Sequence, residues 1–271
     1  MGMPFVTTWI SPGLRHIANR ILGADITYKG PYADWMQAVQ DSVGYDQADI
    51  LSRVADATAQ VLQGDADFEQ DGKPMYGTPP PSHTLAALLM GAVQDHGRLS
   101  VLDFGGGLGS HYLRWRKWLS TISGIKWCVV EQPHFVVKGR QIFSDLPAVV
   151  FEETIEQAKR YNPNVVIASG VLQFLREPFA TLDELIALGT RVIVLDRTPF
   201  IPGDNAQPMT QHVPKQLGAT SYPLWLIPRA SVYTRLRKHY IPLCEFLTQD
   251  APVQAGRVNA NYAGCVWLRK D

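Results

Sequence analysis

Hydrophobic positions along the chain follow a helical period over its first quarter. Apolar residues recur every three or four positions over 33–43 and 48–62, as in Ile50, Val54 and Val61. A stripe of this kind lies on one side of an α-helix and buries that side. The pattern therefore predicts two amphipathic helices near the N-terminus.

A boundary follows these two predicted helices. The stretch from Gly64 to Pro81 is polar, then rich in proline, and ends in three consecutive prolines, which is typical of a linker. Ser82 is a suitable N-cap for a further helix over 83–94. We therefore expect an N-terminal helical segment, residues 1–81, and a larger domain, residues 82–271.

From residue 99 onward, short apolar runs rich in β-branched residues alternate with helical patterns. Strands are predicted over 99–104, 126–131, 148–151, 165–168 and 191–195, and helices over 109–119, 132–143 and 179–188. Most of the runs are continuous rather than alternating, which indicates strands covered on both faces. Such strands are typical of a parallel sheet with helices on each side, an α/β fold.

The last part of the chain follows a different pattern. Two strand-like runs, Tyr240–Phe246 and Tyr262–Leu268, are separated by turn-forming residues and by no helical pattern. Without a crossover helix, two such strands pair antiparallel. We therefore predict a mostly parallel, seven-stranded sheet with an antiparallel last strand.

The clearest local signal is a glycine-rich loop, VLDFGGGLG, between the first predicted strand of the sheet and the next helix. Gly105, Gly106 and Gly107 permit positive φ angles and let the backbone approach a ligand closely. Loops of this type bind nucleoside cofactors at the carboxyl ends of parallel strands. We therefore expect these three glycines to contact a cofactor.

The acidic residues around the loop favour S-adenosylmethionine over NAD. Asp103 is expected near the cationic amino acid group of the former and would be unfavourable beside a pyrophosphate. Ser110 also stands where a dinucleotide loop has its last glycine. Glu131 ends the next strand, where an acid accepts hydrogen bonds from ribose hydroxyls. Other residues at the same edge are expected to line this cofactor site: Gln132, Ser169 and Leu172.

These residues belong to a series of motifs that covers nearly the whole chain. In order, they are YKGPYADWMQAV, VLDFGGGLGSHY, WCVVEQPHFVVKG, ASGVLQFL, VLDRTPF and SYPLW. The series resembles the S-adenosylmethionine-dependent methyltransferases encoded in lipopolysaccharide and exopolysaccharide biosynthesis gene clusters. The resemblance implies a class I methyltransferase (Rossmann-like) fold and a role in surface-glycan biosynthesis. It implies neither a particular acceptor nor a catalytic base.

Three residues after the fifth strand are candidates for the chemistry. His212, in a predicted polar loop, is our first candidate for a general base, and the alternative is a hydrogen-bonded loop histidine. Asp196 would orient that histidine, act as the base itself, or cap a turn. Arg197 would grip an anionic acceptor or form a structural ion pair.

The composition of the chain limits the kinds of partner that we expect. Lys plus Arg and Asp plus Glu are both 25, so the net charge is zero and no nucleic-acid partner is expected. The three cysteines, Cys128, Cys244 and Cys265, lack disulfide or zinc spacing, and no metal is expected. No run reaches the roughly 18 apolar residues of a membrane span, and the first residues lack a signal-peptide pattern. We expect a cytoplasmic protein with a small-molecule or glycan acceptor; homo-oligomer formation is left open.

Three functions compete at this point. The first is O-methylation of a sugar or surface-glycan precursor. The second, an NAD-dependent nucleotide-sugar oxidoreductase, is disfavoured by Asp103 and by the absence of a Tyr-x-x-x-Lys pair. The third is a non-catalytic partner subunit that keeps the methyltransferase fold, which the intact glycine loop disfavours.

Overall fold

A computed structural model describes residues 26–43, 47–80, 82–122, 124–214, 220–248 and 250–271. Residues 1–25, the region of the signal-peptide expectation, and residue 81, the predicted end of the N-terminal segment, lie outside the described residues. None of the described helices is both long enough and apolar enough to cross a membrane.

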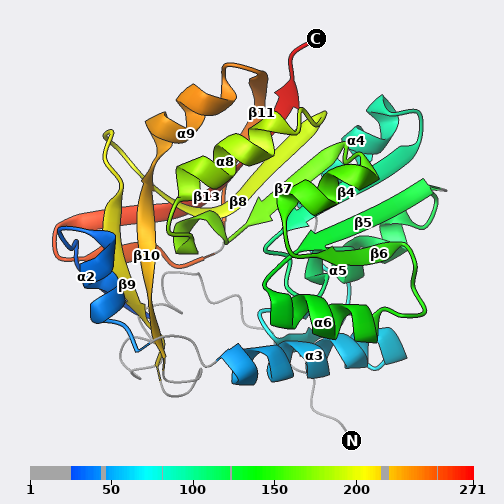
Figure 1. Cartoon of the computed structure of the whole chain (residues 1–271), viewed down its shortest axis with the longest axis horizontal. Helices are drawn as coiled ribbons and strands as arrows, with labels where there is room; N and C mark the ends of the chain where they lie inside the picture. The colour runs from blue at the N-terminus through cyan, green and yellow to red at the C-terminus, as the bar shows by residue number, and fades with distance from the viewer. Residues whose placement is uncertain (1–25, 44–46, 81, 123, 215–219, 249) are drawn as a thin grey trace, which may run out of the picture.

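The central part of the sheet consists of seven strands, whose arrangement Figure 1 shows. In spatial order they are β6 (Val149–Glu152), β5 (Gly124–Val130), β4 (Arg98–Phe104), β7 (Val165–Ser169), β8 (Val192–Ile201), β13 (Val258–Arg269) and β11 (Tyr240–Leu247). The first five are parallel, and β13 runs antiparallel to both β8 and β11. The predicted α/β fold, with its mostly parallel seven-stranded sheet and antiparallel last strand, is confirmed.

Helices cover both faces of this sheet. One face, here called the α5 face, packs against α3 (Gln47–Gln63), α4 (His83–Gln94), α5 (Ser110–Leu119) and α6 (Pro133–Ile142). The other, the α8 face, packs against α7 (Ile155–Ala158), α8 (Pro178–Ala187) and α9 (Arg229–Leu236). Two short 3₁₀ helices, η1 (Lys159–Tyr161) and η2 (Leu172–Phe174), lie before and after β7. The continuous apolar runs of the central strands are explained by this double covering.

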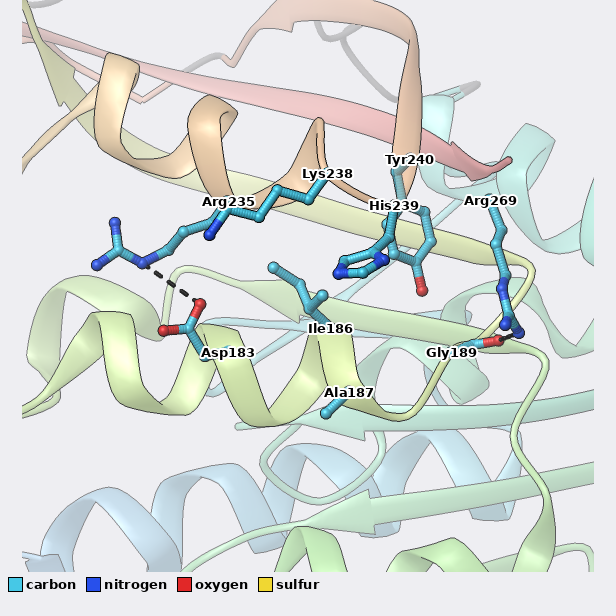
Figure 2. Close-up of a pocket in the computed structure, with 9 residues that line it drawn as sticks. All are labelled: Asp183, Ile186, Ala187, Gly189, Arg235, Lys238, His239, Tyr240 and Arg269. Carbon is cyan, nitrogen blue, oxygen red and sulfur yellow. Dashed lines mark hydrogen bonds and ion pairs between the residues drawn. The ribbon is translucent and has the colours of Figure 1, made fainter. Parts of the chain in front are cut away.

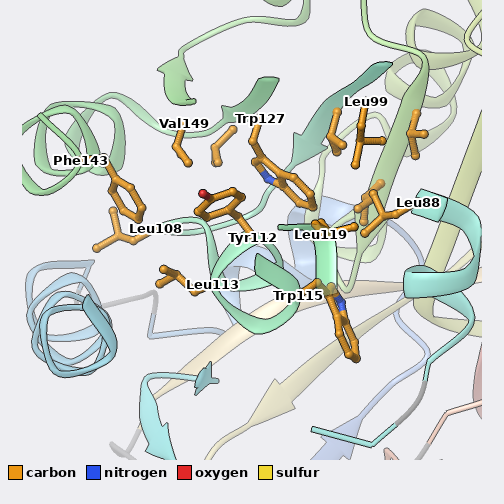
Figure 3. Packing of buried hydrophobic residues seen from close by; sticks show 14 of the residues in the cluster. Leu88, Leu99, Leu108, Tyr112, Leu113, Trp115, Leu119, Trp127, Phe143 and Val149 are labelled. Atoms are coloured by element: carbon orange, nitrogen blue, oxygen red, sulfur yellow. The ribbon is translucent and has the colours of Figure 1, made fainter. Parts of the chain in front are cut away.

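The core of the α5 face is rich in aromatic residues (Figure 3). Trp127 of β5 and Trp115 of α5 are fully buried, and Tyr112 meets the Trp127 ring edge-on with centroids 5.7 Å apart. Edge-on pairs of this kind stabilise a core beyond the area they bury. A buried indole N–H also needs an acceptor, and for Trp127 that acceptor is Asp103, at the carboxyl end of β4. Core packing therefore fixes a side chain at the edge where a ligand was expected.

A part of the sheet that sequence reasoning missed extends the fold beyond β8. β1 (Thr27–Lys29), β9 (Gln207–His212) and β10 (Ser221–Pro228) continue it in the order β1-β9-β10-β8, and β12 (Val253–Ala255) pairs with β13. We call β1, β9 and β10 the extension sheet. The region of β9 was predicted as a loop because its residues are polar and marked by prolines, and β10 was assigned to no element. The strand β1 that pairs with β9 comes from a distant part of the chain.

The N-terminal segment contains more than helices. α2 (Trp35–Gln40) and α3 agree with the two predicted helices, although α2 is shorter, and Ser82 caps α4 as predicted. The predicted linker contains a hairpin of β2 (Phe68–Gln70) and β3 (Lys73–Met75), here called the β2–β3 hairpin. Since β1 pairs antiparallel with β9, this segment also supplies a strand to the main sheet. The proposed division of the chain at residue 81 stays a prediction.

Candidate functional site

The glycine loop connects β4 to α5 at the carboxyl edge of the sheet. Gly105 and Gly107 have φ angles of 69° and 59°, a left-handed conformation that strains other residues. A Cβ on Gly105 would lie 2.4 Å from Cγ2 of Val171, so the β7–η2 turn passes directly against the loop. A Cβ on Gly107 would meet only Oγ of Ser110, at 3.9 Å. The loop therefore packs tightly on one side and leaves open space at Gly107.

Asp103 lies beneath this loop rather than in front of it. Its side chain is fully buried, and a Cβ on Gly106 would lie 2.5 Å from its carboxyl group. The carboxylate accepts a hydrogen bond from Nε1 of Trp127 at 3.1 Å, and Nδ1 of His111 lies 3.1 Å from Oδ1. Contact between Asp103 and the amino group of a cofactor stays a prediction.

His111 is a site residue that the sequence analysis missed. It occupies the first turn of α5, and its side chain is 19% exposed. Burial disfavours its charged form, but the charge of Asp103 and the hydrogen bond to it outweigh burial and raise the pKa of His111 above its ordinary value. The signal available in the sequence was its place two residues after the last loop glycine, which puts it in the first turn of the helix that follows the loop.

Glu131 directly follows β5 and turns toward the glycine loop. Its Oε1 accepts a hydrogen bond from the backbone N–H of Gly107 at 3.3 Å, and its Oε2 accepts one from the N–H of Gln132 at 2.8 Å. Burial raises the pKa of Glu131. Gln132 is exposed and forms the N-cap of α6. The structure thus brings the predicted ribose-binding carboxylate against the predicted cofactor loop.

Two more predicted residues, Ser169 and Asp196, lie at the same edge as direct neighbours in the β7–β8 register. Strand residues two positions apart point to the same face of a sheet. Ser169 and Asp196 come two positions after Ile167 and Val194, which pack on the α5 face, so their side chains point to that face. Burial raises the pKa of Asp196, whose Oδ1 accepts a hydrogen bond from the N–H of Arg197 at 2.8 Å. Both side chains are partly exposed, so a ligand at this edge would meet a serine and a carboxylate.

Leu172 is placed differently from these neighbours. It is 1% exposed and packs in the apolar core of the α8 face. Its predicted contact with the cofactor is not tested by this position, but the side chain helps fix the turn that abuts Gly105.

Arg197 is held by two carboxylates. Nη1 lies 2.9 Å from Oδ1 of Asp71, at the tip of the β2–β3 hairpin, and Nη2 lies 2.9 Å from Oδ1 of Asp250, after β11. The backbone of Arg197 has a φ of 49°, which a non-glycine residue seldom adopts. Of the two roles that the sequence left open for Arg197, these contacts favour the structural ion pair over the grip on an anionic acceptor.

The β2–β3 hairpin reaches across this edge from α5 to β8. Glu69, which is 1% exposed, accepts hydrogen bonds from Oγ of Ser110 and, at 2.6 Å, from the N–H of Gly72. Gln70 accepts one from Arg114 of α5 at 2.7 Å. With Asp71 on Arg197, the hairpin bridges the start of α5 and the end of β8. Nothing in the local sequence indicated these contacts, because their partners are distant in the chain.

His212, the predicted base, lies in the extension sheet. It ends strand β9 rather than lying in a loop, so the predicted loop is wrong. Its Nε2 is 4.0 Å from Oδ2 of Asp41, too far for a hydrogen bond. Burial, together with the charge of Lys29, lowers the pKa of His212. The charges that act on it are therefore those of Lys29 and Asp41 rather than of Asp196 or Arg197, and its catalytic role stays a prediction.

A separate cavity has a volume of about 400 Å³, and Figure 2 shows the residues that line it. Its lining includes Gly189, which precedes β8, and Tyr240, which begins β11. It is thus at the amino end of β8, the opposite end from Asp196. Ligands of open α/β sheets bind outside the carboxyl ends of the strands, and this cavity is not the candidate site. Among the described residues, no group of three or more His, Cys, Asp or Glu side chains is arranged to hold a metal ion.

The chain matches no protein-family model and no curated protein. Among solved structures it is similar to the N-terminal domain of EvdMO1, crystallised in the presence of S-adenosylhomocysteine and D-fucose. The TM-score is 0.48 at 16% identity, over 83% of this chain and 98% of that one.

Two further solved structures are similar over large parts of the chain. CalS10, an amino pentose methyltransferase from Micromonospora echinaspora, has a TM-score of 0.40 at 13% identity, over 72% of this chain and all of that one (100%). Magnesium protoporphyrin IX methyltransferase from Synechocystis PCC 6803 has a TM-score of 0.42 at 12% identity, over 98% and 100%. Similarity at these identities concerns the fold. The seven central strands have a Rossmann-like order in which β13 runs antiparallel to its neighbours.

Proposed function

We propose that this protein is an S-adenosylmethionine-dependent methyltransferase. One observation carries the proposal. The Glu131 carboxylate accepts a hydrogen bond from the backbone N–H of Gly107, next to which there is open space. Both residues lie at the carboxyl ends of the adjacent parallel strands β4 and β5. A carboxylate in this place accepts hydrogen bonds from the two hydroxyls of a ribose. Acidic residues beside the loop are compatible with a cofactor that carries no phosphate. The residues present therefore fit this cofactor.

We assign the cofactor site to the edge formed by β4, β5 and β7. When bound, S-adenosylmethionine supplies a methyl group on a positively charged sulfur. The residues proposed to hold it are Asp103, Gly105, Gly106, Gly107, Glu131, Gln132, Ser169 and Leu172. Asp103 and Leu172 would act from beneath, because both are buried, whereas Gly107 and Glu131 would contact the cofactor directly.

We propose an uncharged hydroxyl of a sugar or surface-glycan precursor as the methyl acceptor. The resemblance to glycan-cluster methyltransferases motivates the class of substrate. The charges at the edge support a neutral group, since Arg197 is already paired with Asp71 and Asp250 and Asp196 adds a further carboxylate. A hydroxyl acceptor needs a base near its oxygen, for which Asp196 and His212 are the candidates from sequence.

The cofactor proposal is tested by isothermal titration calorimetry of the full chain with S-adenosylmethionine, S-adenosylhomocysteine and NAD. We expect heat of binding with the first two and none with NAD. Binding of NAD alone would support the oxidoreductase, and binding of none would end the proposal. Methyl-tritiated cofactor, incubated with neutral monosaccharides, sugar acids and nucleotide-sugars, then tests the acceptor class. Label confined to sugar acids would contradict the neutral acceptor.

No metal is assigned a role in this proposal. We expect methyl transfer to continue at its normal rate after treatment with EDTA and gel filtration. Loss of activity that added Mg²⁺ restores would overturn this expectation.

A further inference from the structure

We propose that His111, oriented by Asp103, is the base that takes the proton from the acceptor hydroxyl. This inference rests on the proposed methyltransferase function and assigns a residue that its other assignments leave out. The observation behind it is a histidine–carboxylate pair placed where the glycine loop becomes helix α5.

The hydrogen bond to Asp103 determines which nitrogen of His111 is available. An ionised carboxylate only accepts hydrogen bonds, so Nδ1 of His111 carries the proton that it shares with Asp103. The neutral ring then has its lone pair on Nε2, on the opposite side of the ring. A carboxylate on Nδ1–H plays the same part in hydrolase triads, where it fixes the tautomer and stabilises the imidazolium that forms.

The ring of His111 is held on its Nδ1 side and is not fully enclosed. Asp103 is fully buried and holds the Nδ1 side of the ring, whereas the histidine side chain as a whole keeps 19% of its surface exposed. No described residue forms a hydrogen bond with Nε2. The charged groups that act on His111 are Asp103 from β4, Asp196 from β8 and Arg114 from its own helix. Asp196 lies at the carboxyl edge where the acceptor is proposed to bind, and its charge acts on the His111 ring.

The proposed step balances without any further reactant. The acceptor oxygen forms a bond to the methyl carbon, and the carbon–sulfur bond of the sulfonium breaks with its electron pair on sulfur. The hydroxyl proton passes to Nε2 of His111, which becomes an imidazolium beside Asp103, and later leaves to solvent. The products are a methyl ether and a neutral thioether.

A test exists that requires no knowledge of the acceptor. S-adenosylmethionine and S-adenosylhomocysteine differ by one methyl group and one positive charge, and that charge sits on the reacting sulfur. If Nε2 faces the reacting atoms, the charge must weaken proton binding to His111. At about 6 Å and an effective dielectric constant of about 20, one unit charge weakens it on the order of 100-fold.

We would titrate the full-length protein, labelled with ¹³C-histidine, by NMR in each of the two cofactor complexes. His111→Asn, which keeps an N–H donor for Asp103, identifies the His111 signal, and His212 is the internal control. We expect the proton affinity of His111 to be at least fivefold lower with S-adenosylmethionine than with S-adenosylhomocysteine, and that of His212 to be unchanged. If both cofactors bind by calorimetry and His111 changes less than fivefold, this inference is overturned and the proposed function stands. If neither cofactor binds, the proposed function itself fails.

Discussion

Two histidines, His111 and His212, lie in regions that are assembled differently: the first in a local strand–loop–helix unit, the second in a sheet of strands from distant parts of the chain. His111 stands eight residues from its partner Asp103, on a loop and helix that follow one strand directly. His212 belongs to a sheet whose neighbouring strands, β1 and β10, come from both sides of it in the chain. Sequence order put His212 downstream of Asp196 and Arg197, but the charges that act on it in the fold are those of Lys29 and Asp41. Residues that are near one another in the sequence were also near one another in the fold only where a single β–α turn joined them, as with Asp103 and His111.

The largest expected difference between His111 and His212 is in the rate of methyl transfer. For an acceptor that the protein methylates, we expect His111→Asn to lower kcat by about 10²- to 10⁴-fold, the usual effect of losing a general base. Cofactor affinity should stay within a few-fold, since the asparagine amide still donates to Asp103. His212→Asn is the matched control and should keep a near-normal kcat. The opposite pair of results would return the base to His212.

The pH profile distinguishes the two histidines independently. A base acts when neutral, so the rate rises with pH through its pKa. The pKa of His111 is raised and that of His212 is lowered, so a limb due to His111 lies above the ordinary histidine value of about 6.5 and one due to His212 below it. We expect the higher limb in kcat/KM for S-adenosylmethionine against pH, because kcat/KM reports the enzyme before the cofactor and its positive charge are bound. The limb should be lost in His111→Asn.

Gly107 tests whether the loop is a binding surface or only a turn. Gly107→Val places a side chain in the open space beside Glu131, and we expect cofactor binding weakened by at least about 100-fold, comparable to the loss of several contacts to a charged group. Gly256→Val is a matched control, because its φ of 58° is nearly that of Gly107 and a Cβ there meets no atom within 4 Å. Calorimetry should show normal affinity in the control. Equal losses in both would mean that backbone strain, not the ligand space, is responsible.

Glu131 should have a smaller effect on the same affinity. Glu131→Ala removes the proposed acceptor of the ribose hydrogen bonds, and we expect a loss of about 1–3 kcal/mol in cofactor binding. Glu153→Ala provides the comparison, since that exposed acid follows β6 as Glu131 follows β5. Unchanged affinity in Glu131→Ala would place the ribose elsewhere.

The central sheet was predictable because each strand, loop and helix carries its own signal. The apolar runs within β5, β7 and β8 are continuous, and the glycine loop follows β4 within the same stretch of sequence. In the extension sheet, β1 and β9 carry no such signal. β9, with the sequence QPMTQH, is mostly polar and begins close to a proline, and its stability depends on pairing with β1 and β10.

The contacts that complete the site were hidden for the same reason. Glu69, Asp71 and Asp250 reach the carboxyl edge from a predicted linker and a predicted turn. Their polar composition is that of any solvated loop, and only the folded chain brings them to Ser110 and Arg197. His111, by contrast, could have been found, because the residue's place in the first turn after the glycines already locates it.

The smallest effect that we predict concerns the two carboxylates on Arg197. The Asp71 side chain is 56% exposed, whereas that of Asp250 is 24% exposed and also accepts a hydrogen bond from Thr248 at 2.7 Å. An exposed ion pair contributes about 0–1 kcal/mol and is screened by salt. We therefore expect Asp71→Asn to lower the free energy of unfolding by less than about 1 kcal/mol, and Asp250→Asn by about 1–2 kcal/mol. Urea unfolding at low and high salt measures both, and the Asp71 effect should shrink at high salt. A larger loss for Asp71→Asn than for Asp250→Asn would show that the β2–β3 hairpin, and not the loop after β11, is the main anchor of Arg197.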